Sequence, residues 1–266
     1  MPSVSVLWNE GWCGRGLEGL RLMRLSLGGF TPMTIALRAV VVDRWGQRAV
    51  EDHVPAGRAN VEEGPMNWRL AYAIGFHPWE DTDPPFAAKI SELFDREEKG
   101  REPPYGPALD LGTGSGIWGI QLAKRGWQVT GIDIVDKALQ RASERVNKAG
   151  VEMRLVHGDV TALRAAGIGS GFRLVLDTGT FHDLNSSQRE AIGREVSAIA
   201  APDATVLLLV WPKRRRPLIR GAHRSEVEAA FPEWKVTDVE PSHFRLPKIL
   251  ELLLKPDEHW YRLRRE

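Results

Sequence analysis

From about residue 66 onward, short apolar runs alternate with segments in which apolar residues recur at helical spacing. The runs, each of which predicts a strand, cover residues 108–111, 127–132, 153–156, 174–176, 206–210, 235–239 and 259–263. Between two of them, Leu139, Ala142 and Val146 form the apolar face of a helix that starts near Asp136 and ends at Gly150. Strands separated by helices of this length predict an α/β fold with a doubly wound, mostly parallel sheet.

Further helices are predicted from their apolar faces and from their ends. A helix before the first strand has an apolar face made of Phe86, Ile90, Leu93 and Phe94. Another runs from Ile117 to near Gly126, and capping-box patterns at residues 187–190 and 225–228 indicate two more helix starts. No helix long enough for a crossover separates the last two strands, so one of them is predicted to run antiparallel.

Residues 1–65 have a different composition from the rest of the chain. They contain nine glycines, seven arginines and no lysine, with one plausible strand at residues 34–42 and no sustained helical period. Because the regular pattern begins directly after Met66, we expect residues 1–65 to be a poorly ordered extension, or to lie upstream of the true start. The alternative is an extension that covers a substrate. Residues 66–266 are predicted to form the functional domain.

Composition narrows the class of protein. With 42% hydrophobic residues in 266, the chain can bury a core without covalent cross-links. The 36 Lys and Arg against 35 Asp and Glu disfavour a general nucleic-acid binder. Cys13 is the single cysteine, so the chain has no intramolecular disulfide and no cysteine-based zinc site. The longest apolar run, 206–211, is far shorter than the roughly 20 residues of a membrane span. These features, with no secretory signal pattern, predict a cytoplasmic location.

A glycine-rich turn carries the main chemical signal. The sequence Leu109-Asp-Leu-Gly-Thr-Gly-Ser-Gly116 stands where the first strand ends and a helix begins. Glycines at 112, 114 and 116 let the backbone turn tightly and approach a ligand closely. Asp133 ends the second strand, where a carboxylate can accept hydrogen bonds from both hydroxyls of a ribose.

Two kinds of nucleotide ligand fit such a turn. Gly114 to Gly119 also matches G-x-G-x-x-G, and Asp133 follows Gly114 by 19 residues, as in a dinucleotide-binding motif. However, four of the predicted parallel strands end in an aspartate, at Asp110, Asp133, Asp159 and Asp177. Because ligands bind at the carboxyl ends of such strands, this acidic rim disfavours a pyrophosphate and favours a nucleoside with a positive charge.

These motifs resemble those of class I S-adenosylmethionine-dependent methyltransferases, over roughly residues 66–266. The resemblance implies a seven-stranded Rossmann-like sheet with an antiparallel last strand beside the fifth. It implies that Gly112, Thr113, Gly114 and Gly116 pass beneath the methionine part of S-adenosylmethionine, with Asp110 near its amino group. It further implies that Asp133 holds the ribose, that Ile134 packs on the adenine, and that Asp159 and the Val160 backbone bind the adenine edge. Asp177 belongs to the same cofactor set.

The sequence has fewer motifs that point to residues binding the methyl acceptor. Residues 75–80 with Pro84 and Pro85 resemble the "P-W-D/E…P" lid of the small-molecule branch, which includes thiopurine, tellurite and heterocycle methyltransferases. This implies that Phe76, His77 and Trp79 contact the acceptor; alternatively, Trp79 only packs the N-terminal helix on the sheet.

After the fourth strand, His182 is the candidate general base, with a packing role as the alternative. The basic loop 213–216 is either solvated or attracts an anionic substrate. The apolar segment 247–255 either caps the acceptor pocket or forms a dimer contact.

The sequence thus predicts a metal-independent methyltransferase that transfers a methyl group to O, S or N of a small, aromatic or heterocyclic acceptor. We expect a monomer or a homodimer. No Asn/Asp-Pro-Pro-Tyr/Phe motif follows the fourth strand, which disfavours the planar amines of adenine, cytosine or glutamine as acceptors. The alternatives are a nucleic-acid methyltransferase, a NAD-dependent oxidoreductase on the same fold, and a binding protein without turnover.

Overall fold

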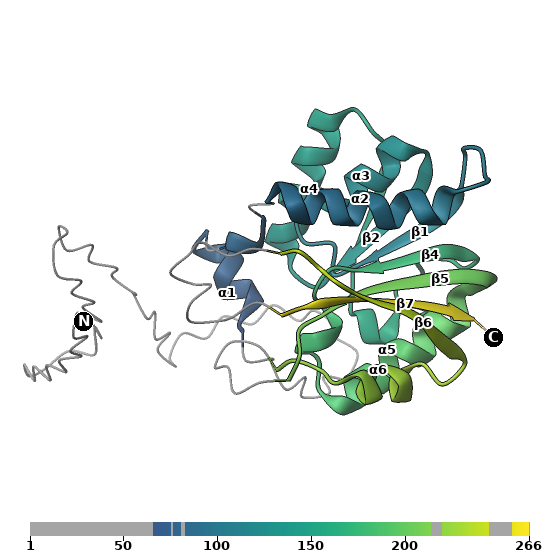
Figure 1. The fold of residues 1–266 in the computed structure, drawn as a ribbon. Helices are drawn as coiled ribbons and strands as arrows, with labels where there is room; N and C mark the ends of the chain where they lie inside the picture. Colours follow the sequence, from purple (N-terminus) through teal and green to yellow (C-terminus); the bar gives the residue numbers. More distant parts are fainter. Residues whose placement is uncertain (1–65, 76, 81–82, 214–219, 245–256, 266) are drawn as a thin grey trace, which may run out of the picture. The chain divides into compact units, whose positions relative to one another are not determined.

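A seven-stranded sheet between two layers of helices forms the part of the chain that the computed structural model describes (Figure 1). The described residues are 66–75, 77–80, 83–213, 220–244 and 257–265. The extension 1–65, Phe76, residues 214–216 of the basic loop and the apolar segment 247–255 lie outside these ranges.

The sheet order is β3-β2-β1-β4-β5-β7-β6. The strands are β1 (Gly106–Leu111), β2 (Trp127–Asp133), β3 (Met153–His157), β4 (Phe172–Asp177), β5 (Ala200–Val210), β6 (Trp234–Pro241) and β7 (His259–Arg265). The first five strands are parallel, and β7 lies antiparallel between β5 and β6. The predicted fold class is confirmed, including the antiparallel last strand beside the fifth.

Helices cover both faces of the sheet (Figure 1). One layer contains α2 (Pro84–Glu98), α3 (Ile117–Arg125) and α4 (Asp136–Ala149), and the other contains α5 (Ser186–Ile199) and α6 (Arg224–Ala230). Three short 3₁₀ turns are η1 (Pro78–Glu80), η2 (Val160–Ala162) and η3 (Phe181–Asp183). The short helix α1 (Trp68–Ala73) lies at the end where the parallel strands finish. Among the helices in the described ranges, none has the length and hydropathy that crossing a bilayer requires.

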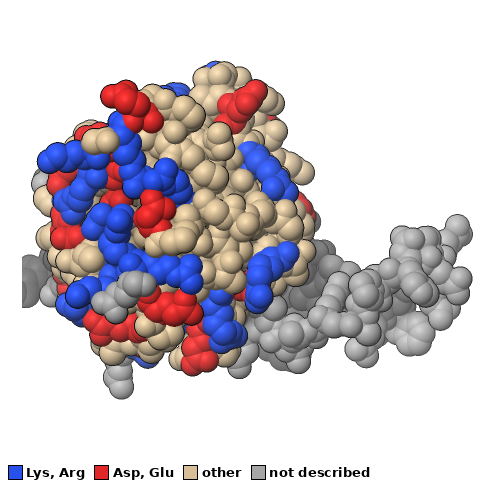
Figure 2. All heavy atoms as spheres, turned by 90° about the vertical axis from the view of Figure 1, so that its right-hand side faces the viewer, with Lys and Arg blue, Asp and Glu red and all other residues tan. Residues whose placement is uncertain are grey.

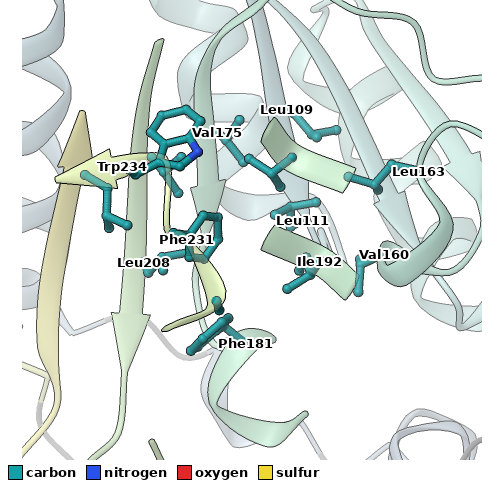
Figure 3. Packing of buried hydrophobic residues seen from close by; sticks show 14 of the residues in the cluster. Leu109, Leu111, Val160, Leu163, Val175, Phe181, Ile192, Leu208, Phe231 and Trp234 are labelled. Atoms are coloured by element: carbon teal, nitrogen blue, oxygen red, sulfur yellow. The ribbon is translucent and has the colours of Figure 1, made fainter. Parts of the chain in front are cut away.

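Alternate residues of the central strands supply two cores, because successive side chains point to opposite faces. Leu109 and Leu111 of β1 pack with α5 and α6, in the cluster that also holds Phe181 and Phe231 (Figure 3). Ala108 packs on the other face against α2. The predicted apolar face of α2, made of Phe86, Ile90, Leu93 and Phe94, is fully buried there. This packing fixes the strand ends that carry the site.

Two predicted helix starts are wrong by two residues. Helix α5 is capped by Asn185, whose side chain accepts from the Gln188 N–H while Gln188 accepts from the Asn185 N–H. Helix α6 begins after His223, and the Glu226 carboxylate accepts from the His223 N–H at 2.9 Å. In both cases an equivalent reciprocal pair stands two residues before the predicted one and satisfies the free N–H groups first.

Candidate active site

The glycine-rich turn has the backbone that only glycine adopts readily. Gly112 and Gly114 have φ of 62° and 54°, in the left-handed region. A Cβ on Gly112 would overlap the Thr180 hydroxyl, which donates to the Leu111 carbonyl. A Cβ on Gly114 would lie 2.8 Å from the Tyr72 hydroxyl. The turn is therefore packed between the loop after β4 and helix α1, and a side chain at either position would disrupt it.

Asp133 joins the end of β2 to this turn. Its Oδ2 accepts from the Gly114 N–H and its Oδ1 from the Val135 N–H, both at 2.8 Å. Burial raises the pKa of Asp133, and the backbone donors oppose that rise. The next residue, Ile134, is 39% exposed, which is unusual for a large apolar side chain at the end of a buried strand. A carboxylate beside an exposed apolar surface fits a ribose and a flat base.

Asp110 is a buried carboxylate with one oxygen unpaired. Its Oδ2 accepts from the Thr113 hydroxyl at 2.6 Å, whereas its Oδ1 has no hydrogen-bond partner. Burial raises the pKa of Asp110 to about 7, against the opposing hydrogen bond from Thr113. The Ser115 hydroxyl is also buried without a partner. Buried polar groups without partners cost free energy, so a ligand with N–H donors at this turn would stabilise it.

The other two aspartates of the predicted rim hold turns. The Oδ1 of Asp159 accepts from both the N–H and the hydroxyl of Thr161, at 2.8 Å each, and the neighbouring Val160 is buried. Asp177 is completely buried and accepts three backbone N–H groups, from residues 179, 180 and 181. Its carboxylate fixes the start of η3, and its contact with a cofactor stays a prediction.

The predicted lid packs on itself and on α4. The Trp79 ring lies 5.0 Å from that of Trp68 and 5.8 Å from that of Tyr72, between ring centroids. His77 stacks on Tyr72 at 5.9 Å. Glu80 is buried and accepts from Arg141 and Arg145 of α4, at 2.7 and 2.8 Å.

Besides this ring packing, Trp79 Nε1 donates to the Tyr72 hydroxyl at 3.4 Å, and the contact of Trp79 with an acceptor stays a prediction. The approach of Tyr72 to the turn was not predicted, because residues 72 and 114 are far apart in sequence and no motif connects them.

His182 begins a row of aromatic side chains along the carboxyl ends of β4 and β5. Ring centroids are 6.3 Å apart for His182 and Trp211, 6.3 Å for Trp211 and Phe244, and 5.4 Å for Phe244 and Phe86. We call these four residues the aromatic wall. His182 Nδ1 lies 3.3 Å from the Leu209 carbonyl, and burial lowers the pKa of His182 to about 4. The imidazole is therefore neutral at pH 7, and a donating Nδ1 leaves Nε2 as the acceptor.

The opposite end of the sheet has no comparable set of groups among the described residues. A surface hollow of about 1060 Å³ lies where β1, β2 and β3 begin, lined by Trp127, Met153 and Phe172 among others. On the face shown in Figure 2, Lys and Arg side chains alternate with Asp and Glu over one half. Within the described residues, this face therefore offers no basic surface for a nucleic-acid backbone.

The strand order, the antiparallel β7 and the glycine-rich turn after β1 define the class I methyltransferase form of the Rossmann-like fold. Residues 108–203 match the family model described as a methyltransferase domain. Residues 108–203 are therefore a methyltransferase domain, and the described residues have the fold of class I S-adenosylmethionine-dependent methyltransferases. The narrow glycine turn, the unpaired Asp110 oxygen and the exposed Ile134 fit that cofactor.

Relatives of known activity are similar over part of their length. The chain is 30% identical over 144 residues to the 2-heptyl-1-hydroxyquinolin-4(1H)-one methyltransferase of Mycobacteroides abscessus, which covers 52% of this chain and 63% of that protein. The chain thus spans less than two thirds of that relative.

Two solved structures share the fold. The 1,6-didemethyltoxoflavin-N1-methyltransferase of Burkholderia thailandensis has a TM-score of 0.56 at 18% identity, over 74% of this chain and 84% of that one. The magnesium protoporphyrin IX methyltransferase of Synechocystis has a TM-score of 0.57 at 16% identity, over 74% and 95%.

Proposed function

We propose that this protein transfers a methyl group from S-adenosylmethionine to an O, S or N atom of a small, planar aromatic or heterocyclic acceptor. The observation that carries the proposal is the aromatic wall, which stands beside the glycine-rich turn. The two are directly connected, because Thr180 of the loop that leads to His182 donates to the carbonyl of Leu111. His182, Trp211 and Phe86 are buried and Phe244 is partly buried, so the wall presents ring edges at this end of the sheet. Flat rings pack well against aromatic edges and faces, so the wall favours a planar acceptor. The quinolone and toxoflavin acceptors in the names of similar proteins agree with this choice.

When bound, S-adenosylmethionine supplies a methyl group attached to a positively charged sulfur. The acceptor's lone pair forms a bond to the methyl carbon while the carbon–sulfur bond breaks, and the electrons of that bond stay on the sulfur. The chain's contribution is mainly to hold the reactants in line and to exclude water. Asp133 and Ile134 hold the nucleoside, Asp110 and the glycine turn hold the amino-acid part, and Asp159 accepts from the adenine amine. Trp68 and Tyr72 of α1 pack with Trp79 of the lid against Val135 and Ala138, and Tyr72 lies next to the turn.

His182 has a limited part in proton transfer. A base with a pKa of about 4 has little tendency to take a proton near neutral pH, so it contributes by accepting a hydrogen bond through Nε2. The proton of an acceptor hydroxyl or thiol is then released to bulk solvent when the methylated product leaves the site. This role orients the nucleophile and needs the neutral imidazole.

The first test is turnover with a defined panel. Wild-type protein is incubated with S-adenosylmethionine and a phenol, a thiophenol, a hydroxyquinoline or total RNA, and S-adenosylhomocysteine formation is measured from pH 5 to 9. We expect turnover with at least one flat small molecule and not with RNA. His182→Asn should lower kcat/KM, and wild-type activity should show no loss from His182 protonation near pH 6.5, because its pKa is about 4. Turnover with RNA alone would contradict the proposed acceptor class.

A further inference from the structure

Arg189 of α5 is a buried cation that bridges separate segments at the carboxyl edge of the sheet. It is only 4% exposed. Its Nε donates to the Phe181 carbonyl at 3.2 Å, and its Nη2 donates to the carbonyls of His182 and Gly221 at 2.9 and 2.6 Å. Its Nη1 donates to Glu226 of α6 at 2.7 Å. One guanidinium therefore connects η3, the chain segment before α6, and α6 itself.

The Gly221 end of this bridge fixes the position of Trp211. The N–H of Ala222, next to Gly221, donates to the Trp211 carbonyl at 2.8 Å, so the chain leaving β5 and the chain entering α6 meet there. The contact is tight, since a Cβ on Gly221 would lie 2.5 Å from the Pro212 carbonyl oxygen. Displacing the Gly221 carbonyl would therefore displace Trp211.

The other end of the bridge fixes His182. Phe181, the residue before it, is completely buried in the core beside Phe231 (Figure 3). The Arg189 guanidinium lies 5.4 Å from the Phe181 ring centroid. Asp177 binds the N–H groups of this turn, and Arg189 binds its carbonyls, so both kinds of backbone group are satisfied.

Only arginine suits this position. Four acceptors surround the side chain in different directions, and a guanidinium offers five donors in a rigid fork, whereas a lysine offers three from one atom. Burying a cation is costly, and the ion pair with Glu226 offsets only part of that cost. An apolar residue would fill the space on α5 but would leave the carbonyls of Phe181, His182 and Gly221 without this donor, so the cation holds these segments together.

We propose that Arg189 is a positioning residue for the methyl acceptor, which holds His182 and Trp211 of the aromatic wall at a fixed separation. The inference rests on the proposed function, because it assumes that the wall binds the acceptor. Arg189 contacts neither the glycine turn nor Asp133 among its described partners, so its effect should fall on the acceptor and not on the cofactor.

The test compares Arg189→Lys and Arg189→Gln with Arg194→Lys, a conservative change at an exposed position of the same helix. S-adenosylhomocysteine affinity is measured by calorimetry, and kcat and KM are measured for the acceptor that the wild type methylates. We expect both Arg189 variants to bind S-adenosylhomocysteine within about twofold of wild type, while kcat/KM for the acceptor falls roughly tenfold or more, as loss of a charged hydrogen bond implies. Arg194→Lys should match wild type throughout.

A second readout does not depend on turnover. The His182 imidazole is titrated by NMR, with its resonance assigned by its absence in His182→Asn. Because the Arg189 charge helps to keep His182 neutral, Arg189→Gln should raise the pKa of His182. If Arg189→Gln does not fold, Glu226→Gln, which alters a half-exposed partner, should produce the kinetic change in the same direction with a smaller size.

The outcomes separate the two proposals. If wild type methylates no small molecule of the panel, the proposed function fails, and the His182 titration still tests the bridge. Equal losses of cofactor affinity and of kcat/KM for the acceptor in a folded Arg189 variant would overturn the inference. Values of kcat and KM for the acceptor that are unchanged from wild type would overturn it as well. An unchanged His182 pKa in folded Arg189→Gln would show that the guanidinium does not control that side chain.

Discussion

Asp110 and Asp177 occupy equivalent positions, at the ends of β1 and β4, but they differ in their hydrogen bonds and in their pKa values. Asp177 accepts three backbone N–H groups, which keep its pKa near 6 despite complete burial. Asp110 accepts from the Thr113 hydroxyl and the Gly119 N–H but has one unpaired oxygen, and burial raises its pKa to about 7. The sequence predicts both as strand-end carboxylates, because their positions are equivalent. It does not predict which one has its hydrogen bonds filled by a neighbouring turn, since that depends on the loop's conformation.

Asp110→Asn should change how stability depends on pH. The folded-state pKa of Asp110 is raised from 3.8 to about 7, so its protonated form stabilises the fold at low pH, and this contribution is lost as pH rises through 7. Above that pH, wild type carries a buried charge and Asp110→Asn does not. Relative to wild type, the melting temperature of cofactor-free Asp110→Asn should therefore rise from about pH 4 to about pH 7 and then stay level at higher pH.

The matched control is Asp95→Asn, since the Asp95 side chain is 65% exposed on α2. A pH dependence of the melting temperature that is the same in Asp110→Asn and wild type would show that the Asp110 carboxyl does not titrate in this range.

For helices and strands, the period of hydrophobic residues predicts which segments become helix or strand, whereas local hydrogen bonds determine the residues at which they begin and end. The apolar face of α2 and the central runs of β1 to β5 follow from the pattern. The start of α5 does not, because Asn185 with Gln188 and Ser187 with Glu190 fit the same capping rule. Strand β5 begins at Ala200, earlier than its apolar run, because Ala200 pairs with Phe172 of β4. Residues 202 and 203 in this first part of β5 are exposed, so they interrupt the hydrophobic run that would have predicted the strand's start.

Gly112→Ala tests whether the turn is set by packing as well as by backbone conformation. Gly167 is a matched control with the same φ of 62° and no atom within 4 Å of an added Cβ. We expect Gly167→Ala to cost about 1–2 kcal/mol of unfolding free energy, the backbone part alone. Gly112→Ala should cost about 1–3 kcal/mol more, because its Cβ meets the Thr180 side chain.

Chemical denaturation measures both Gly→Ala variants. Equal losses of stability would mean that the loop after β4 yields without cost and does not shape the turn.

For the molecule as a whole, the sequence predicts the topology and the glycine-rich turn, but not how separate segments meet around them. Motif spacing places Asp133 and the glycines at one edge, because consecutive strands and turns are close in both sequence and space. The link from Trp68 to Asp183 at 2.8 Å spans 115 residues, and the bridge from Arg189 to Gly221 spans 32. Such contacts depend on the packing of α1, η3 and α6, which no local pattern encodes.

The central claim is that this edge binds S-adenosylmethionine, and calorimetric titration tests it most directly. Wild type is titrated with S-adenosylmethionine, S-adenosylhomocysteine and NAD, and Asp133→Asn is compared with Asp136→Asn, which changes an exposed carboxylate three residues away. We expect micromolar binding of the first two ligands and none of NAD. Asp133→Asn should bind roughly tenfold or more weakly, as expected when a charged hydrogen-bond acceptor is lost, and Asp136→Asn should match wild type. Binding of NAD alone, or wild-type affinity in Asp133→Asn, would contradict the assignment of this edge as an S-adenosylmethionine site that includes Asp133.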